Sequence, residues 1–418
     1  MEAITAKTPW ESWMGQVPMH LEYFEGSMFD AVAKIAREYP ENIAFDFQGL
    51  PTSYPDMIVR IEQCARALKA LGIGEGDKVT IAMPNCPQAV FLFYGVNRIG
   101  AIANMIHPLS AEKEIEFYLN ESESETAITL NMFYPKFARV LPNTGVKHLV
   151  IANIADALSP TLKVGFAVKN VIEPIAKALK KRTKPQFLPK IPKNAPKVVL
   201  WKDFLAGAET VKGEYAVARR SEDPAVILYS GGTTGTTKGI VLTNKNFNAL
   251  GQQVVAANPI FTPGDKMLAA MPLFHGFGLG VCVHTMLSQG GRCILIPQFT
   301  AKTYAKDLVK HRCNFIAGVP TLYEALLRLP SMKGADLSCL KGVFSGGDSL
   351  SIELKKKFDK FLAEHKATIQ VREGYGTTET VTACCLTPLT KAKEGSIGIP
   401  FSDVYIKIVE PGTDKELP

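Results

Sequence analysis

The chain has 418 residues, of which 46% are hydrophobic and 21% charged, an ordinary globular usage that excludes a disordered, collagen-like or coiled-coil protein. Of its formal charge of +7, residues 160–200 carry a net +9, from ten Lys or Arg and one Glu, so the remaining residues sum to −2. Charge concentrated in one segment excludes a chain-wide basic field for nucleic acid, and the length predicts two or three domains of about 150 residues.

The first part of the chain alternates helical and extended patterns. Apolar residues at helical spacing predict helices around 29–36, 54–71 and 88–100. Short apolar runs predict strands at 43–47 and 79–83. Such alternation predicts an α/β fold with a mainly parallel sheet covered by helices.

The basic segment, about 160–200, interrupts this alternation. Residues 163–182 fit an amphipathic basic helix, whereas 183–197 cannot continue one because prolines remove backbone donors and clash with the preceding turn. We interpret the segment as a surface insertion, rich in basic residues and proline, in a first α/β lobe covering 1–222.

The alternation resumes at residue 223, which predicts a second α/β lobe over 223–390. Its predicted strands are 225–229, 240–242, 266–270, 292–296, 315–318 and 342–345, and its predicted helices are 246–256, 277–288, 304–311, 322–329 and 351–365.

The last residues, 391–418, predict the start of a smaller β-subdomain. Residues 404–409 alternate as a strand, 410–414 read as a turn, and the chain stops where a return strand would begin. We therefore expect the chain to be a fragment, truncated inside this subdomain.

The eight cysteines include no C-x-x-C pair, and only Cys384 and Cys385 are adjacent. This spacing favours buried thiols in a reducing compartment over a zinc site or a disulfide framework. The N-terminus has no apolar signal-peptide core, and no apolar run reaches the roughly 18 residues of a membrane span. We expect a soluble, cytoplasmic protein.

The most specific motif follows the strand predicted at 225–229 and reads Tyr229-Ser-Gly-Gly-Thr-Thr-Gly-Thr-Thr-Lys-Gly239. Glycines let backbone amides approach an anion closely, five hydroxyls can donate to phosphate oxygens, and Lys238 adds a positive charge. The motif differs from a kinase-type P-loop because Lys238 is followed by Gly239. It predicts a phosphate-binding loop, and a flexible surface turn is the less favoured alternative.

Two further motifs lie downstream. Gly374-Tyr-Gly-Thr-Thr-Glu379 places an aromatic ring between glycines, where it can stack on a base, and ends in a carboxylate able to hold Mg²⁺. Ser345-Gly-Gly-Asp348 ends an apolar strand, where ligand crevices lie in α/β sheets, although a glycine turn is an equal reading of it alone.

The three motifs in this order resemble the adenylate-forming (AMP-binding) superfamily, which includes acyl-CoA synthetases, firefly-type luciferases and peptide-synthetase adenylation domains. Segments 271–279, Met-Pro-Leu-Phe-His-Gly-Phe-Gly-Leu, and 318–323, Gly-Val-Pro-Thr-Leu-Tyr, are similar to acyl-CoA synthetases, including long-chain fatty acid-CoA ligases. The resemblance implies a ligase that joins ATP and a carboxylate into acyl-AMP with loss of pyrophosphate, and then passes the acyl group to coenzyme A. It also implies two lobes with mixed or parallel sheets, a β-barrel-like subdomain and a small C-terminal domain.

The resemblance also implies roles for individual residues. Lys238, Thr378, Glu379 and His275 would be catalytic, with Glu379 holding Mg²⁺ and His275 beside the reacting carboxylate. The ATP or AMP would contact Ser230, Gly231, Gly232, Thr233, Thr234, Gly235, Thr236, Lys238, Gly346, Gly347, Asp348, Gly374, Tyr375, Gly376, Thr377 and Thr378, and the acyl group would contact His275, Phe277, Gly278, Gly318 and Ser345.

The chemistry needs such groups. Attack of a carboxylate on the α-phosphorus brings two anions together, so a cation, hydrogen-bond donors and Mg²⁺ must disperse charge. Taken alone, His275 would read as a core histidine, and its place after Met271-Pro-Leu-Phe274 favours the functional role. Thr237 stands where most family members have proline. The family's ribose-binding aspartate and its C-terminal domain with the catalytic lysine would follow Pro418.

Several alternatives stay open. Glycines at 276, 278, 280 and 318 favour a medium- or long-chain fatty acid. A fatty acyl-AMP ligase, an aryl-CoA ligase and a catalytically impaired nucleotide-binding scaffold are the others. The basic segment could be a solvated insertion, a peripheral attachment to anionic membrane, or an attractor of phosphate or coenzyme A.

Overall fold

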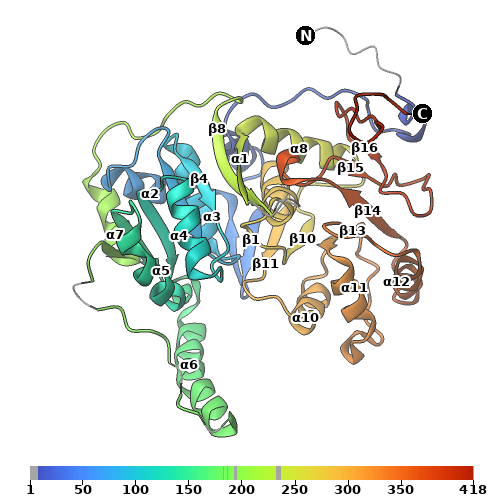
Figure 1. Ribbon diagram of the computed structural model, residues 1–418. Helices are drawn as coiled ribbons and strands as arrows, with labels where there is room; N and C mark the ends of the chain where they lie inside the picture. Colours follow the sequence, from blue (N-terminus) through green and yellow to red (C-terminus); the bar gives the residue numbers. More distant parts are fainter. Residues whose placement is uncertain (1–7, 182, 186, 193–194, 232–236, 418) are drawn as a thin grey trace.

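Two mainly parallel sheets covered by helices form the body of the protein (Figure 1). The computed structural model describes residues 8–417, except for 182, 186, 193–194 and 232–236. One sheet has seven strands, in the order β7-β6-β5-β3-β4-β8-β9, and the other has nine, in the order β16-β15-β14-β13-β12-β10-β11-β1-β2. The α/β class and the two mixed, mostly parallel sheets expected from the sequence are confirmed.

The seven-stranded sheet pairs its strands in parallel except for the antiparallel hairpin β8–β9. Its strands are β3 (Lys78–Ala82), β4 (Ile102–Met105), β5 (Thr126–Leu130), β6 (His148–Ala152), β7 (Val198–Leu200), β8 (Pro224–Ser230) and β9 (Lys238–Thr243). The helices of this part are α2 (Tyr54–Ala70), α3 (Pro87–Arg98), α4 (Glu112–Glu121), α5 (Tyr134–Val140) and α7 (Trp201–Gly207).

In the nine-stranded sheet, the strands β1, β11, β10, β12, β13 and β14 pair in parallel. β2, β15 and β16 pair antiparallel at its two edges. Its strands are β1 (Ile43–Phe47), β2 (Leu50–Ser53), β10 (Lys266–Ala269), β11 (Arg292–Leu295), β12 (Phe315–Gly318), β13 (Gly342–Ser345), β14 (Val371–Tyr375), β15 (Cys385–Leu386) and β16 (Ile399–Pro400). The associated helices are α1 (Met28–Glu38), α8 (Asn244–Ala256), the π-helical η6 (Phe277–His284), α9 (Thr285–Ser288), α10 (Ala301–His311), α11 (Pro320–Leu327) and α12 (Ile352–Glu364).

Local sequence signals explain many of these boundaries. The Ser27 hydroxyl accepts the Asp30 amide and the Asp30 carboxylate accepts the Ser27 amide, which closes a capping box at the start of α1. Ser53 caps α2 in the same position, followed by a proline in the first turn. β3 is apolar along most of its length and buried, as a strand covered on both faces must be.

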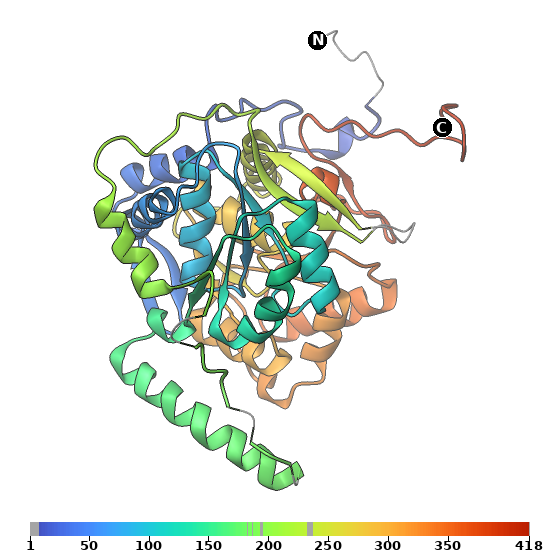
Figure 2. The ribbon, with the colours of Figure 1, turned by 60° about the vertical axis from the view of Figure 1, so that its left-hand side comes forward.

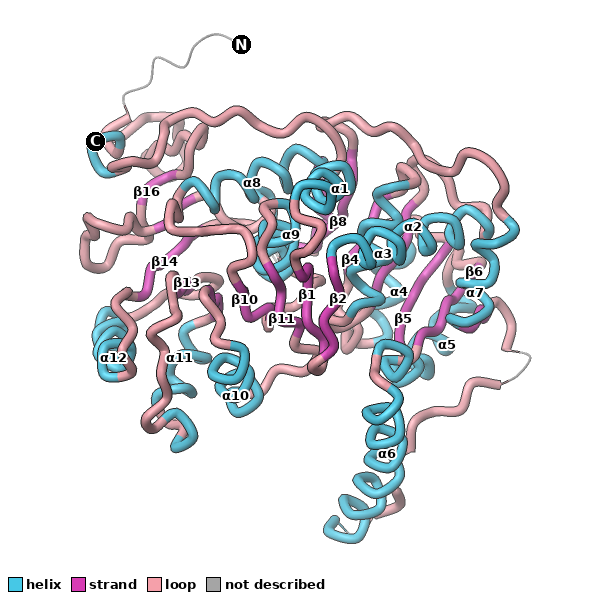
Figure 3. Tube along the Cα trace, turned by 180° about the vertical axis from the view of Figure 1, so that it is seen from behind, coloured by secondary structure: helices cyan, strands magenta, loops and turns pink. Residues whose placement is uncertain are grey.

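The chain does not divide into sheets at the predicted boundary of 222 and 223. β1 and β2 join the sheet of β10–β16, with β1 beside β11 in the view from behind (Figure 3), and β8 and β9 complete the sheet of β3–β7. Burial gives the reason: β1 is buried from Ala44 to Phe47, so the backbone groups on both of its edges need partners, which β2 and β11 supply. The two predicted lobes therefore exchange strands.

The basic segment contains one helix, α6 (Pro160–Lys181), which extends away from the body (Figures 1 and 2). The predicted helix 163–182 is confirmed as far as Lys181, and residue 182 lies outside the described residues. Pro174 lies inside α6, and the described part of 183–197 forms no helix, as predicted. In the part of the chain that is described, no helix is both long and apolar enough to cross a bilayer.

The strand predicted at 404–409 is wrong. Only an isolated bridge joins Val409 to Glu416, with the Leu417 amide donating to the Ile408 carbonyl at 2.8 Å, because no longer partner strand lies beside the segment. The turn is confirmed by the Thr413 amide, which donates to Glu410 O at 3.0 Å. The described part of 391–418 contributes β16 to the large sheet and forms no barrel.

The core runs through both sheets and the helices between them. A second apolar cluster lies under α10, α11 and α12. All eight cysteines are free thiols, and seven of them are buried, which confirms the buried, unpaired state expected from their spacing.

Candidate functional site

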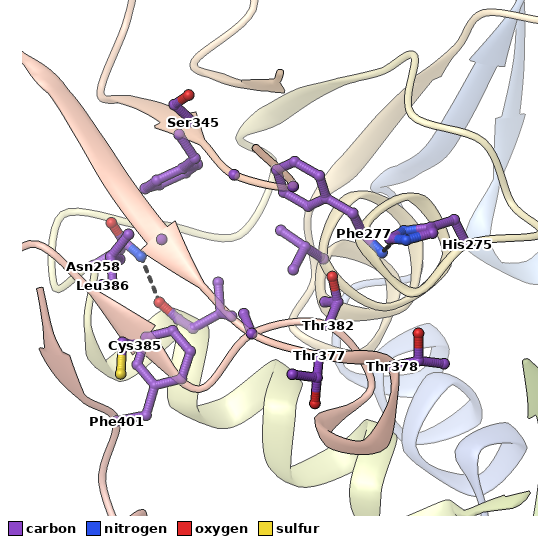
Figure 4. Close-up of a pocket in the computed structure, with 18 residues that line it drawn as sticks. Asn258, His275, Phe277, Ser345, Thr377, Thr378, Thr382, Cys385, Leu386 and Phe401 are labelled. Carbon is purple, nitrogen blue, oxygen red and sulfur yellow. Dashed lines mark hydrogen bonds between the residues drawn. The ribbon is translucent and has the colours of Figure 1, made fainter. Parts of the chain in front are cut away.

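A cavity of about 210 Å³ lies where the ends of β13 and β14 meet α8, η6 and the loop before β15 (Figure 4). Of the residues singled out from the sequence, it brings together His275, Phe277, Ser345, Gly346, Gly347, Gly374, Gly376, Thr377 and Thr378. The sequence reasoning did not identify its other lining residues, which are Val254, Asn258, Val281, Phe344, Thr382, Ala383, Cys385, Leu386 and Phe401.

The segment that carries His275 is held from the other sheet by Asn85, which is 3% exposed. The Asn85 amide donates to the carbonyls of Ala269 and Met271, at 2.9 and 2.8 Å, and its oxygen accepts the Leu273 amide at 3.1 Å. Because a buried side chain satisfies three backbone groups, the segment 269–273 has a fixed path into the site.

His275 is held in one neutral form. Its Nδ1 accepts the Phe277 amide at 3.1 Å, so Nδ1 carries no proton and Nε2–H is the donor (Figure 4). Burial by the surrounding protein lowers the pKa of His275, although part of the ring remains exposed to solvent. The site therefore offers an uncharged N–H donor at this position.

The glycines of the next turns are needed for close contacts with the chain. A Cβ at Gly276 would lie 1.7 Å from the Val381 carbonyl oxygen, and one at Gly278 would lie 2.1 Å from the Pro272 carbonyl oxygen. Gly278 thus packs against backbone and is not among the cavity residues. Gly318, where a Cβ would lie 2.4 Å from Leu322 Cδ2, is also outside the lining.

The loop after Gly374 folds back tightly against η6. A Cβ at Gly376 would lie 1.9 Å from the Thr382 carbonyl oxygen. Val381 has a φ of 63°, which is a genuine outlier for a β-branched residue, and it is 2% exposed. Strain of this kind clusters at ligand sites, where the surrounding structure holds it in place.

The loop continues into η8 (Thr378–Thr380), which contacts both β8 and β9. In this hairpin Ser230 pairs with Lys238, so the predicted phosphate-binding loop spans the hairpin tip. Ser230, Gly231 and Lys238 are described, and the predicted contacts of Gly232, Thr233, Thr234, Gly235 and Thr236 lie outside the described residues. The fold thus brings the hairpin to the same side as Thr378 and Glu379.

Of the residues predicted to border adenine, Gly346 and Gly347 line the cavity, whereas Asp348 and Tyr375 do not. Gly347 has a φ of 78°, the conformation that favours glycine, and Asp348 is exposed, with Oδ1 accepting the Ser349 amide at 2.7 Å. Tyr375 is 46% exposed and lies outside the lining, whereas its neighbours Gly374 and Gly376 line the cavity. Successive residues of a strand face opposite sides of the sheet, so the Tyr375 side chain leaves β14 on the side opposite to that of Gly374.

A buried cation supports the cavity wall. Arg372, 6% exposed, donates to the Thr387 carbonyl at 2.6 Å, the Ala257 carbonyl at 3.1 Å and the Asn258 side-chain oxygen. Burial lowers the pKa of Arg372 to about 10, so it stays charged at neutral pH. Since Asn258 lines the cavity, this charge lies close behind its wall.

Ser345 ends β13 and lines the cavity, and its hydroxyl has no hydrogen-bond partner in the described structure although the residue is 1% exposed. A buried polar group without a partner is uncommon and fits a site where a ligand or water supplies one.

Glu379 is exposed in η8, and the described residues contain no cluster of three or more His, Cys, Asp or Glu that could enclose a metal. Mg²⁺ is commonly held by one or two carboxylates together with substrate phosphates and waters, so a single carboxylate fits this ion when phosphates are bound.

Comparisons with known proteins show which sequences and folds the chain is similar to. The AMP-binding enzyme family matches residues 32–418. The long-chain-fatty-acid–CoA ligase of Bacillus subtilis (strain 168) is 28% identical over 97% of the chain and 70% of its own length, and that of Haemophilus influenzae (strain ATCC 51907 / DSM 11121 / KW20 / Rd) is 30% identical over 94% and 68%.

Solved structures share the fold. The anthranilate CoA ligase AuaEII in complex with anthranoyl-AMP has a TM-score of 0.76 at 21% identity, over 97% of this chain and 69% of that one. The inhibitor-bound N-terminal domain of FACL13 from Mycobacterium tuberculosis has a TM-score of 0.69 at 23% identity, over 90% and 82%.

Proposed function

The chain belongs to the family of AMP-binding enzymes, and we propose that it activates a medium- or long-chain fatty acid with ATP, forming acyl-AMP and releasing pyrophosphate. In the full-length protein, coenzyme A then accepts the acyl group as a thioester. The relatives named as long-chain-fatty-acid–CoA ligases support this choice of substrate, at 28% and 30% identity.

The observation that carries the proposal is a cavity that combines a few polar groups with a largely apolar lining. Its polar side chains are those of Asn258, His275, Ser345, Thr377, Thr378 and Thr382. The rest of the wall is largely apolar, through Val254, Val281, Phe344, Ala383, Leu386 and Phe401. A carboxylate with an apolar tail matches such a lining.

The proposed reaction forms a bond between a carboxylate oxygen and the α-phosphorus of ATP. The bond from that phosphorus to the bridging oxygen of the β-phosphate breaks, and its electron pair leaves with pyrophosphate. Two anions must meet, so the His275 Nε2–H would hold the carboxylate oxygen without adding a proton, and Thr378 would donate to the α-phosphate.

The nucleotide would lie beside the cavity. Tyr375 would stack on adenine next to Gly347 and Asp348, while Ser230 and Lys238 would hold the β- and γ-phosphates from the β8–β9 hairpin. When bound by Glu379 and the phosphates, Mg²⁺ would neutralise phosphate charge.

The cavity volume favours a second candidate, the activation of a compact aryl acid. About 210 Å³ is less than the roughly 300–1,000 Å³ typical of small-molecule sites, and a benzoate-sized ring needs less room than a long tail. A long-chain acid requires the cavity to become larger than this.

Carboxylate-dependent exchange of labelled pyrophosphate into ATP tests the proposal in the natural full-length protein. A panel of octanoate, dodecanoate, hexadecanoate and benzoate is compared at equal concentration. We expect exchange with the fatty acids. Exchange with benzoate alone would favour the aryl candidate, and no exchange with any acid, despite ATP binding, would support a nucleotide-binding scaffold instead.

The acyl acceptor is tested separately. Adding coenzyme A to the active carboxylate should release AMP and form a thioester. Accumulation of acyl-AMP that coenzyme A does not discharge would assign a fatty acyl-AMP ligase.

A further inference from the structure

The helix α6 carries an uncovered apolar stripe along one side. Val164, Val168, Val171, Ile172 and Ile175 are 65%, 49%, 53%, 59% and 40% exposed. They follow one another at spacings of four, three, one and three residues, which places them on one face of a helix. The stripe is about 16 Å long at 1.5 Å per residue.

The opposite side of α6 is charged. Lys169, Glu173 and Lys177 repeat every four residues, and the Glu173 carboxylate lies 2.6 Å from the Lys177 ammonium and 3.9 Å from that of Lys169. In sequence, α6 has five lysines and one glutamate, a net charge of +4 in 22 residues. The helix is thus both strongly amphipathic and basic.

The body of the protein does not cover the stripe. α6 extends away from the two sheets in both side views, and the element it mainly contacts is the short η4 (Ile154–Ala157) near its start (Figures 1 and 2). A helix whose apolar side faces water gains no stability from burial, so the sequence pattern needs another surface to explain it.

We propose that α6 docks on the surface of a bilayer that contains anionic lipid, with the valine and isoleucine stripe in the headgroup boundary and the lysines toward the lipid phosphates. Charge complementarity selects this occupant, because a net +4 helix is attracted to an anionic surface and repelled by a second copy of itself. The docking depends on α6 and not on the proposed activation of a carboxylate.

The helix lies along the surface and does not span it. An interfacial helix has a large charged face and a low net hydrophobicity, and α6 has both, whereas a span needs about 20 predominantly apolar residues. Docking would hold the body at the membrane surface through one projecting arm.

Sedimentation with sucrose-loaded vesicles tests the proposal with the whole chain. Vesicles of phosphatidylcholine alone are compared with vesicles in which part of it is replaced by phosphatidylglycerol, at low and high salt. We expect binding to the anionic vesicles at low salt that weakens as salt rises, since the Debye length falls from about 10 Å at 0.1 M to about 3 Å at 1 M.

Two variants separate the apolar and the charged contributions. Val171→Asp should abolish binding, and the pair Lys169→Glu and Lys177→Glu should reduce the partition coefficient by about tenfold or more. Val59→Asp, on the exposed face of α2, and the pair Lys306→Glu and Lys310→Glu on α10 are matched controls that should bind like the natural chain. Circular dichroism checks that every variant keeps its helix content.

The result that overturns the proposal is binding that is equal for both vesicle types, absent from both, or unaffected by Val171→Asp. Concentration-dependent dimerisation in sedimentation velocity that Val171→Asp abolishes would also overturn it, because the stripe would then be an interface between two copies of the chain.

Discussion

His275 is fixed as a neutral donor by one backbone hydrogen bond, since its Nδ1 accepts the Phe277 amide. Replacing it with Ala removes the Nε2–H that would hold the reacting carboxylate. Loss of one such donor costs about 10²–10³-fold in rate, and we expect carboxylate-dependent pyrophosphate exchange to fall by about that factor. ATP binding should change little. His148→Ala, on β6, is the control, and an unchanged exchange rate in His275→Ala would contradict the role.

The pH dependence of pyrophosphate exchange is also expected to reflect the protonation of His275. The pKa of His275 lies below its usual 6.5 because burial disfavours the charged form, so the neutral donor persists at pH 6.5 and is lost only at lower pH. We expect the His275 contribution to exchange to be full above pH 6.5 and to decline as the pH falls through the lowered pKa. A contribution that rises as the pH falls would contradict this protonation state.

Gly276 tests the close contact between η6 and the loop before β15. A Cβ there would overlap the Val381 carbonyl oxygen, so Gly276→Ala must displace either the segment that leads into η6 or the loop before β15. We expect exchange to be lost and the free energy of unfolding to fall by about 1–3 kcal/mol, as for other overpacked sites. Chemical denaturation measures the second effect.

The matched control is Gly145→Ala, because a Cβ at Gly145 meets no atom within 4 Å and its φ is not positive. It should leave both quantities unchanged. Equal behaviour of the two variants would show that the contact at Gly276 does not shape the cavity.

At the scale of elements, η6 is joined to its neighbours by a buried histidine. The His284 Nδ1 lies 3.0 Å from the Tyr94 hydroxyl, and its Nε2 lies 3.0 Å from the Asn248 side-chain oxygen. Asn248 donates its amide to Gly26 O, so its oxygen accepts from Nε2–H, and Tyr94 donates to Nδ1. His284 is therefore neutral, and burial lowers its pKa to about 3.

This pKa predicts an acid-sensitive fold. The unfolded chain binds a proton at His284 near pH 6.5 and the folded chain near pH 3, so stability is full above about 6.5 and is lost as the pH falls. The loss is about 1.4 kcal/mol per pH unit within that window. Urea unfolding at several pH values should show a shallower acid slope for His284→Gln. The slope is compared because Gln alters packing at every pH, and an unchanged slope would contradict this origin.

Much of the element pattern could be predicted from the sequence. The strand at 315–318 and the helix at 246–256 follow from apolar periodicity and capping, which are local. The sequence could not show that Gly278 and Gly318 lie outside the cavity lining, because a glycine motif does not reveal whether a ligand or a neighbouring part of the chain needs the space. Phe344 and Leu386 belong to the cavity through strand pairing, for which no local pattern exists.

The same limit of local patterns applies to the site, where several residues could be predicted and Arg372 could not. His275, Ser345 and Thr378 meet at one cavity because β10, β13 and β14 run parallel, so the segments at their carboxyl ends lie at the same edge of the large sheet. Arg372 was missed because it lies two positions before the motif and its residue type gives no indication that it turns inward to hold Asn258.

At the scale of the molecule, the exchange of strands between the two sheets makes the two halves of the chain interdependent. Residues 1–222 alone would leave β1 without β11 and β4 without β8. Residues 223–418 alone would leave β11 without β1 and β8 without β4. We expect neither half to unfold cooperatively when expressed alone, because each exposes apolar strand edges. Calorimetry on the two halves measures this, and a cooperative transition in both would show that they are independent domains.

This exchange also explains why the boundary at 222 and 223 was not a boundary between sheets. The basic segment interrupts the sequence pattern, but pairing of β1 with β11, about 250 residues later, is a long-range contact that composition does not report. The projecting helix α6, by contrast, was predictable, since its amphipathic pattern is contained within 22 residues.

The central claim is that one site joins a carboxylate to AMP. Isothermal titration of the chain with a non-hydrolysable sulfamoyl analogue of dodecanoyl-AMP, compared with AMP and dodecanoate separately, tests it most directly. We predict that the analogue binds more than about tenfold tighter than either half, since one site holds both groups at once. Analogue binding no tighter than that of AMP would contradict the claim, because the cavity beside Tyr375 would then contribute nothing to holding the acyl group.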